Sequence, residues 1–207
     1  MSRPLVICDC DEVLLHMVSH FGAWLDEAYD LEFRLEGTDF VNAIRSKGDG
    51  APLAREEVWP LLNGFFETEM GRQTVVPGAS EALVSISEYA DIVILTNLQD
   101  AFRDARARQL RNFAIDFPVH TNQGGKGAKV VELVEAHRPP VAVFVDDLAQ
   151  HHASVAEQHP EVWRLHMIAE PQIAGNIGPA EHAHARIDDW HEARAWIIDR
   201  ITEGETA

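Results

Sequence analysis

Two aspartates one residue apart, Asp9 and Asp11, come directly after a short apolar run near the start of the chain, residues 5–8. A short apolar run that ends in charged residues predicts a buried parallel strand, and open α/β sheets bind ligands at the carboxyl ends of such strands. Side chains alternate along an extended chain, so both carboxylates are expected to point the same way, with Cys10 pointing away. Because neighbouring carboxylates repel, the pair indicates a divalent metal ion or a shared proton. The alternative is that the two acids cap the next helix.

Polar residues also follow two later apolar runs, which are predicted to be strands at residues 91–95 and 141–145. Thr96 and Asn97 end the first run, and Asp146 and Asp147 end the second. The carboxyl ends of parallel strands lie at one edge of a sheet, so these residues are expected to converge with the first aspartate pair. Taken alone, Thr96-Asn97 is more typical of a turn than of a phosphate-binding site, and paired acids also cap helices.

A lysine lies in the glycine-rich turn 124–127, which leads into a predicted helix ending near residue 137. The turn lacks the spacing of a P-loop. Magnesium prefers oxygen ligands and often binds one or two carboxylates, which suits Asp9 and Asp146. Phosphoryl transfer requires neutralisation of the phosphoryl oxygens, which a metal ion, Lys126 and the Thr96 hydroxyl would supply together. The residue types therefore favour metal-assisted phosphoryl chemistry.

From residue 77 onward, predicted helices and buried strands alternate, which indicates an α/β fold with a doubly wound, Rossmann-like parallel sheet. Between the first strand and this region, apolar residues recur at helical spacing over residues 14–29 and 55–70, and strand alternation is absent. The chain is therefore expected to form a core from residues 1–13 and 76–207, with residues 14–75 inserted as a helical cap. Four arginines of the predicted helix 100–112 are expected on its solvated side: Arg103, Arg106, Arg108 and Arg111.

These residues, taken in order, resemble the four motifs of the haloacid dehalogenase-like hydrolase superfamily. The first motif is similar to Val6-Ile7-Cys8-Asp9-Cys10-Asp11-Glu12-Val13, and the second to Ile94-Leu95-Thr96-Asn97. The third is a lysine near a helix start, for which Lys126 is chosen over Lys129, and the fourth is similar to Phe144-Val145-Asp146-Asp147. Most members are magnesium-dependent phosphatases, and an insertion between the first two motifs resembles the class with a small helical cap.

The resemblance implies a role for each matched residue. Asp9 would be the nucleophile and a metal ligand, and Asp11 would be the general acid/base that lends its backbone carbonyl to the metal. Thr96 would hold the phosphoryl group, with Asn97 and Lys126 also on the substrate. The last acid pair completes the set: Asp146 would bind Mg²⁺, and Asp147 would support the metal or Lys126. The expected reaction is hydrolysis of a small phosphorylated metabolite through an aspartyl-phosphate.

Three other functions are weighed against this one. Carbon–halogen hydrolysis needs neither a metal nor the acid Asp11, and a receiver-type phospho-acceptor module has its acids in a different order and lacks the insertion. A partner-binding relative without activity is a third alternative. Zinc binding is a weaker hypothesis, based on His151, His152, His182 and His184 without cysteine partners. In the insertion, Arg34 is a candidate for recognising a distal anion of the substrate.

The chain has 207 residues, which suits one domain or one domain with an insertion. Its 34 acidic and 17 basic residues give a net charge of −17, which disfavours nucleic acid and anionic membranes as partners. The two cysteines, Cys8 and Cys10, lie too close in one strand for a good disulfide, which fits a reducing compartment. Without a signal peptide or a bilayer-length apolar run, a cytoplasmic protein is expected, as a monomer or homodimer.

Overall fold

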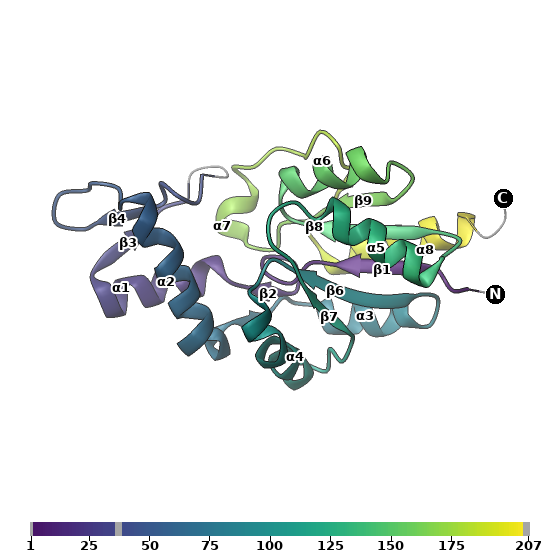
Figure 1. The fold of residues 1–207 in the computed structure, drawn as a ribbon, viewed down its shortest axis with the longest axis horizontal. Helices are drawn as coiled ribbons and strands as arrows, with labels where there is room; N and C mark the ends of the chain where they lie inside the picture. Colours follow the sequence, from purple (N-terminus) through teal and green to yellow (C-terminus); the bar gives the residue numbers. More distant parts are fainter. Residues whose placement is uncertain (1, 36–38, 205–207) are drawn as a thin grey trace.

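The sheet at the centre of the molecule forms because short apolar runs pair in parallel and are covered on both faces by amphipathic helices (Figure 1). The computed structural model describes residues 2–35 and 39–204. The ends of the predicted core, at residues 1 and 205–207, and residues 36–38 of the predicted insertion lie outside the described residues. In spatial order the six strands are β10 (Ala185–Arg186), β9 (Trp163–His166), β8 (Ala142–Asp146), β1 (Leu5–Cys8), β6 (Asp91–Thr96) and β7 (Val119–Thr121).

All the pairings in this sheet are parallel, and β1 lies between β6 and β8. Successive residues of β1 pack into different layers. Val6 and Cys8 join the apolar cluster that includes residues of α3 (Ala79–Ser87) and α8 (Trp190–Gly204). Leu5 and Ile7 join the cluster that includes residues of α5 (Gly127–His137) and α6 (Ala149–Gln158). The structure therefore confirms the predicted α/β, doubly wound parallel sheet.

The register of the central strands determines where the polar residues at their carboxyl ends lie. Cys8 pairs with both Ile94 and Val145, so Asp9 comes level with the carboxyl ends of β6 and β8. The N–H of Asp9 donates to the carbonyl of Val145 at 2.9 Å. The polar ends of the three strands therefore meet at one edge of the sheet, as the sequence predicts.

The segment between β1 and α3 protrudes from the sheet and forms the left-hand lobe of Figure 1. It contains α1 (Val18–Tyr29), α2 (Arg55–Thr68) and η1 (Met70–Arg72). Its apolar cluster centres on Phe21, Trp24 and Phe65, and it extends to Leu98 and to Ala105 of α4 (Arg103–Asn112). The insertion therefore has a hydrophobic cluster of its own, which also contacts the sheet domain.

The expectation that residues 14–75 contain no strand is wrong. The short strands there are β2 (Leu15–His16), β3 (Leu31–Phe33), β4 (Ile44–Ser46) and β5 (Thr74–Val75). β2 pairs with β5 where the chain leaves and re-enters the sheet domain, and β3 pairs with β4 as a hairpin. Strands of two or three residues are too short to show an alternating pattern, so the sequence carried no signal for them.

The first helix of the insertion also begins later than its apolar pattern predicts, at Val18. Glu12 explains the start, because its Oε1 accepts the N–H groups of Met17 (2.7 Å) and Val18 (2.6 Å). Two backbone donors at the start of the helix are satisfied in this way. Two further elements were not predicted: β10 and the short helix α7 (Pro171–Ala174). Among the residues that the structure describes, none of the helices combines the length and the hydrophobicity that a membrane span requires.

Candidate active site

The chain turns sharply as it leaves β1. The carbonyl of Cys10 accepts the N–H groups of Leu14 (2.8 Å) and Leu15 (2.9 Å), and Glu12 has a φ of 60°, in the left-handed region. Strand alternation therefore stops at Cys8. Although alternation predicts that Asp9 and Asp11 point the same way, the structure gives their carboxylates separate partners.

Asp9 faces a buried lysine. The Lys126 Nζ lies 2.7 Å from Asp9 Oδ1 and 2.6 Å from Asp146 Oδ2, and the Lys126 side chain is fully buried. Burial alone lowers the pKa of an ammonium, but Asp146 and Asp9 outweigh it and raise the pKa of Lys126, which therefore stays charged. Lys129 instead pairs with Glu132 on the surface, at 2.8 Å. Of the two candidate lysines, Lys126 is the one that reaches the sheet edge.

Glycine on each side of this lysine allows α5 to approach α6 closely. A Cβ on Gly127 would lie 2.2 Å from the carbonyl oxygen of Ser154, and one on Gly125 would lie 2.8 Å from Ser154 Oγ. The N–H of Gly127 donates to Ser154 Oγ at 3.0 Å. The Gly-Lys-Gly sequence therefore places Lys126 by removing the side chains that would keep α5 away from α6.

Three carboxylates share the sheet edge: Asp9, Asp146 and Asp147 each offer an oxygen, and these oxygens lie within 4.8 Å of one another. Burial raises the pKa of Asp147 well above its usual range, and the charges of Asp146 and Asp9 add to this effect. Burial also raises the pKa of Asp9, although Lys126 opposes the shift. Because the lysine only partly offsets the repulsion, and because all the donors are oxygens, the group fits a Mg²⁺ ion.

Two histidines hold the backbone of the last acid pair. His152 Nε2 lies 3.0 Å from the carbonyl of Asp146, and burial lowers the pKa of His152 to about 3. His166 Nδ1 accepts the N–H of Ala180, which leaves Nε2 to donate to the carbonyl of Asp147 at 2.8 Å. Both rings are therefore neutral supports that fix the position of the two acids.

The zinc hypothesis for the other histidines finds no support in the described part of the chain. His184 Nδ1 accepts the N–H of Arg164, and the carbonyl of His182 accepts the Arg164 Nε–H. Two groups of acidic and histidine side chains have the spacing of metal ligands there, and neither contains His151, His152, His182 or His184.

Thr96 and Asn97 differ in their surroundings. Thr96 is buried, and its Oγ1 has no hydrogen-bond partner among the described residues. A buried hydroxyl without a partner is costly unless a ligand satisfies it. Asn97 instead supports the glycine-rich turn, because its Nδ2 donates to the carbonyl of Gly124 at 2.9 Å and its Oδ1 accepts from Asn122 Nδ2.

Asp11 belongs to a second polar network, which the sequence did not reveal. Arg106 Nη2 donates to Asp11 Oδ1 at 2.9 Å and to Oδ2 at 3.0 Å, and Gln73 Nε2 donates to Oδ1 at 2.6 Å. Arg106 is fully buried, and its guanidinium also lies over the ring of Phe66, 5.4 Å from the ring centroid. The expectation that Arg106 faces solvent is therefore wrong, because the Asp11 carboxylate compensates its charge inside the protein.

The other arginines of this helix, Arg103, Arg108 and Arg111, are exposed as predicted. Arg106 differs from them because it shares a buried face with Gln109 and Leu110, at i+3 and i+4. This helical spacing was the signal in the sequence that could have placed Arg106 on the buried face of the helix. Arg34, the candidate for substrate recognition, is exposed at the end of β3, where its Nε donates to Glu32 Oε1 at 2.7 Å.

Comparison of the sequence with protein-family models found no match, and comparison with curated proteins found none either. Comparison of the structure with solved structures found 79 matching chains. One match is a haloacid dehalogenase-like family hydrolase from Streptococcus pneumoniae, with a TM-score of 0.64 and 12% identity over 93% of this chain and 97% of that one. The chain has the fold of the haloacid dehalogenase-like hydrolases.

Two further matches show the range of proteins with this fold. A putative phosphoglycolate phosphatase from Lactobacillus delbrueckii subsp. bulgaricus has a TM-score of 0.65 at 13% identity, covering 95% of this chain and 99% of that one. A subfamily IA hydrolase of the same superfamily, from Geobacter sulfurreducens, has a TM-score of 0.60 at 21% identity, covering 95% of both chains. At identities this low, the structural similarity shows the shared fold alone. In this chain, three of the four motifs lie at the carboxyl ends of β1, β6 and β8, and the remaining one, Lys126, precedes α5 and reaches the same edge.

Proposed function

We propose that this protein is a Mg²⁺-dependent phosphatase that hydrolyses a small phosphorylated metabolite through an aspartyl-phosphate intermediate. The observation that carries the proposal is the position of Lys126, buried between Asp9 and Asp146 at the sheet edge where Thr96 offers a buried, unpartnered hydroxyl. An ammonium and a hydroxyl beside a carboxylate cluster suit a phosphoryl group better than an uncharged substrate. Two proteins of the same fold that are described as phosphoglycolate phosphatases support this choice.

In the proposed reaction, a carboxylate oxygen of Asp9 attacks the phosphorus atom. The new O–P bond forms as the bond from phosphorus to the leaving oxygen breaks, and Asp11 gives that oxygen a proton. Lys126 and the Thr96 hydroxyl bind phosphoryl oxygens, with Asn97 beside them. Asp11 then takes a proton from water, which attacks the phosphorus atom and releases inorganic phosphate and the Asp9 carboxylate.

We further propose that Asp9, Asp146 and the backbone carbonyl of Asp11 hold Mg²⁺, with Asp147 supporting the ion or Lys126. The carboxylate spacing and the raised pKa of Asp147 support this assignment. When bound, the ion would neutralise phosphoryl oxygens and reduce the repulsion between substrate and Asp9.

The pairing of Asp11 with Arg106 adds a condition to this mechanism. Both carboxylate oxygens accept hydrogen bonds from Arg106 Nη2, so proton transfer from Asp11 to a leaving group requires the carboxyl group to exchange these contacts for one with the substrate. We propose that Asp11 parts from Arg106 during the cycle. Gln73, which also donates to Asp11, lies just before β5 at the end of the insertion, so movement there would reach Asp11 directly.

We propose that residues 14–75 act as a cap over a core formed by residues 1–13 and 76–207. The separate hydrophobic cluster of the insertion and the β2–β5 pair at its base support this division. Arg34 is proposed to contact the part of the substrate away from the phosphate, since it is an exposed cation on the insertion. The net charge of −17 and the free thiols of Cys8 and Cys10 support a cytoplasmic protein that does not bind nucleic acid or membranes. A monomer or homodimer is proposed.

The test is hydrolysis of p-nitrophenyl phosphate by purified protein with and without Mg²⁺. We expect turnover that requires Mg²⁺ and that EDTA abolishes, followed by a screen of phosphorylated metabolites to find the natural substrate. Turnover in excess EDTA would contradict the metal assignment. Release of halide from a 2-haloacid in place of phosphate release would favour the dehalogenase alternative.

A further inference from the structure

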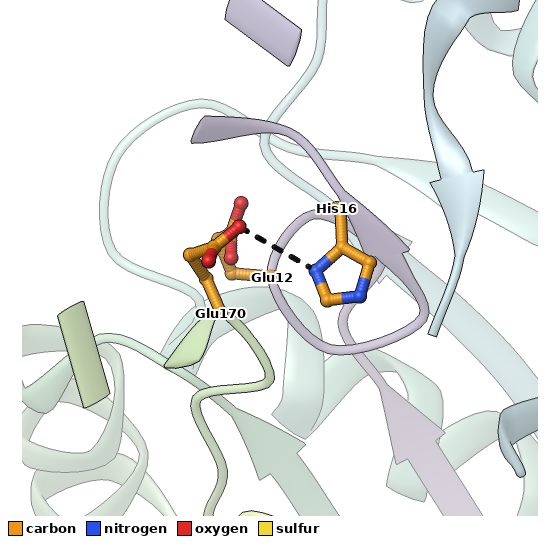
Figure 2. Close-up of side chains that lie close together, drawn as sticks. All are labelled: Glu12, His16 and Glu170. Atoms are coloured by element: carbon orange, nitrogen blue, oxygen red, sulfur yellow. Dashed lines mark ion pairs between the residues drawn. The ribbon is translucent and has the colours of Figure 1, made fainter. Parts of the chain in front are cut away.

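A second group of metal-ligating side chains lies at the base of the insertion, apart from the carboxylates assigned to Mg²⁺. Glu12, His16 and Glu170 each offer a ligand atom, and these atoms lie within 4.8 Å of one another. Figure 2 shows the three side chains turned toward one another from separate parts of the fold: the loop after β1, strand β2 and the residue before α7. Glu12 and Glu170 are buried, at 2% and 4% exposure.

The atoms that face the centre of this group lack hydrogen-bond partners among the described residues. Glu12 Oε1 is used by the start of α1, but Glu12 Oε2 is buried without a partner. His16 Nδ1 is also buried without one, and it lies 3.7 Å from Glu170 Oε2. That separation is too long for a hydrogen bond, but it is close to the distance between two atoms bound to one ion at about 2.1 Å each.

The charges and ligand types of the group also favour a bound cation. Glu12 and Glu170 bring two buried carboxylates close together, and like charges at this spacing repel unless a cation lies between them. Two carboxylates and a neutral imidazole form a common ligand set for zinc and related transition metals, whereas Mg²⁺ prefers oxygen ligands alone.

We propose that Glu12, His16 and Glu170 bind a transition-metal ion of the zinc type. The ion would join three segments at the root of the insertion. The neighbouring contacts are consistent with a junction there, since the N–H of Ala169 donates to the carbonyl of Glu12 at 2.8 Å, and Val18 of α1 packs with Ile168 and Ile173. The ion would act as a structural brace between α1 and α7, separate from the proposed phosphatase chemistry.

The test counts metal ions per chain in protein that has been stripped with EDTA and then equilibrated with Zn²⁺ in the presence of millimolar Mg²⁺. Elemental analysis of wild-type protein is expected to show one more Zn²⁺ per chain than Glu170→Gln or His16→Gln. Glu161→Gln and His191→Gln replace exposed residues of the same types elsewhere, and they should match the wild type. Mn²⁺ should bind the same site at least about tenfold more weakly than Zn²⁺.

A second measurement uses Co²⁺ as a spectroscopic probe and thermal unfolding as a stability probe. Co²⁺ should give a visible absorption band in the wild type that His16→Gln removes, and saturating Zn²⁺ should raise the wild-type Tm by roughly 5 °C or more but leave that of His16→Gln unchanged. If Glu170→Gln does not fold, His16→Gln carries the test, because His16 is partly exposed.

Equal Zn²⁺ content in the wild type and in folded His16→Gln would overturn the proposal, as would the absence of bound Zn²⁺ in the wild type. Neither result depends on catalysis, so failure of this site and failure of the phosphatase assignment are distinguishable. A protein without phosphatase activity that still binds the additional Zn²⁺ would support this site alone.

Discussion

Asp9 and Asp11 are separated by a single residue, yet each is paired with a different kind of cation. Asp9 shares Lys126 with Asp146 at the sheet edge, whereas Asp11 is the carboxylate bound by Arg106, whose other terminal nitrogen donates to Gln73 and Gln109. A lysine is a compact charge that can move between acceptors, while the planar guanidinium of Arg106 is held by several acceptors at once. The proposed nucleophile is therefore positioned by the sheet, while the proposed acid is held by contacts that involve the insertion.

Replacing each aspartate by asparagine gives the largest expected difference between the two sites. Asp9→Asn removes the attacking oxygen, so kcat for p-nitrophenyl phosphate should fall about a thousandfold or more. Asp11→Asn keeps the nucleophile and loses proton transfer, for which a loss of about a hundredfold is expected. Steady-state kinetics on both folded variants checks this order, and substantial turnover by Asp9→Asn would remove Asp9 as the nucleophile.

Arg106→Met tests the Asp11 network. It leaves a largely buried carboxylate without its charged partner, so the free energy of unfolding should fall by about 3 kcal/mol. Arg108→Met alters an exposed arginine of the same helix and should change stability by less than about 0.5 kcal/mol. Denaturant unfolding of both variants gives the comparison, and equal stabilities would mean that the Asp11–Arg106 pair contributes little.

Gly127→Ala tests whether the close approach of α5 to α6 is needed to position Lys126 at the sheet edge. The added Cβ would collide with the Ser154 carbonyl, so α5 must shift, and we expect a loss of about 2 kcal/mol or more in stability, with reduced phosphatase activity. Gly178→Ala is the matched control, since a Cβ there meets no atom within 4 Å. Wild-type stability and activity in Gly127→Ala would show that the close approach of α5 and α6 is not needed.

The smallest effect is expected from Arg34→Ala, because Arg34 is exposed and its ion pair with Glu32 is screened by solvent. Stability should change by less than about 0.5 kcal/mol. If Arg34 contacts the substrate, the variant should change the preference among natural phosphate esters more than turnover of p-nitrophenyl phosphate. Equal losses on both kinds of substrate would exclude Arg34 from specificity.

The sequence predicted the structure best where an apolar run that forms a strand is followed directly by the polar residues of the candidate site. The run before Asp146 predicted β8 to within one residue, and the strand-end polar residues predicted the edge at which Lys126 meets Asp9. Each of these signals lies within a few residues of chain, as an apolar run followed by a charge.

The parts that were missed depend on contacts between distant segments. Asp11 and Arg106 are far apart in sequence, and the helical spacing that places Arg106 on the same face as Leu110 does not identify Asp11 as its partner. Likewise, Glu12 and His16 gave no sign of Glu170, which comes beside them only after the chain has passed through β9. Pairing at long range is set by tertiary packing, for which a single sequence carries no periodic signal.

The central place of β1 has a consequence for how the protein is made. Leu5 pairs with Asp91 and with Ala142, so β1 can pair with β6 only after the insertion and α3 have been synthesised, and with β8 only after α4 and α5. Until β6 is made, this apolar strand has neither neighbour, and contacts of such large sequence separation form slowly. The insertion, which has its own hydrophobic cluster, is complete earlier. We therefore expect the insertion to fold first, and the carboxyl edge of the sheet that holds Asp9 and Asp146 to form only when β8 has been made.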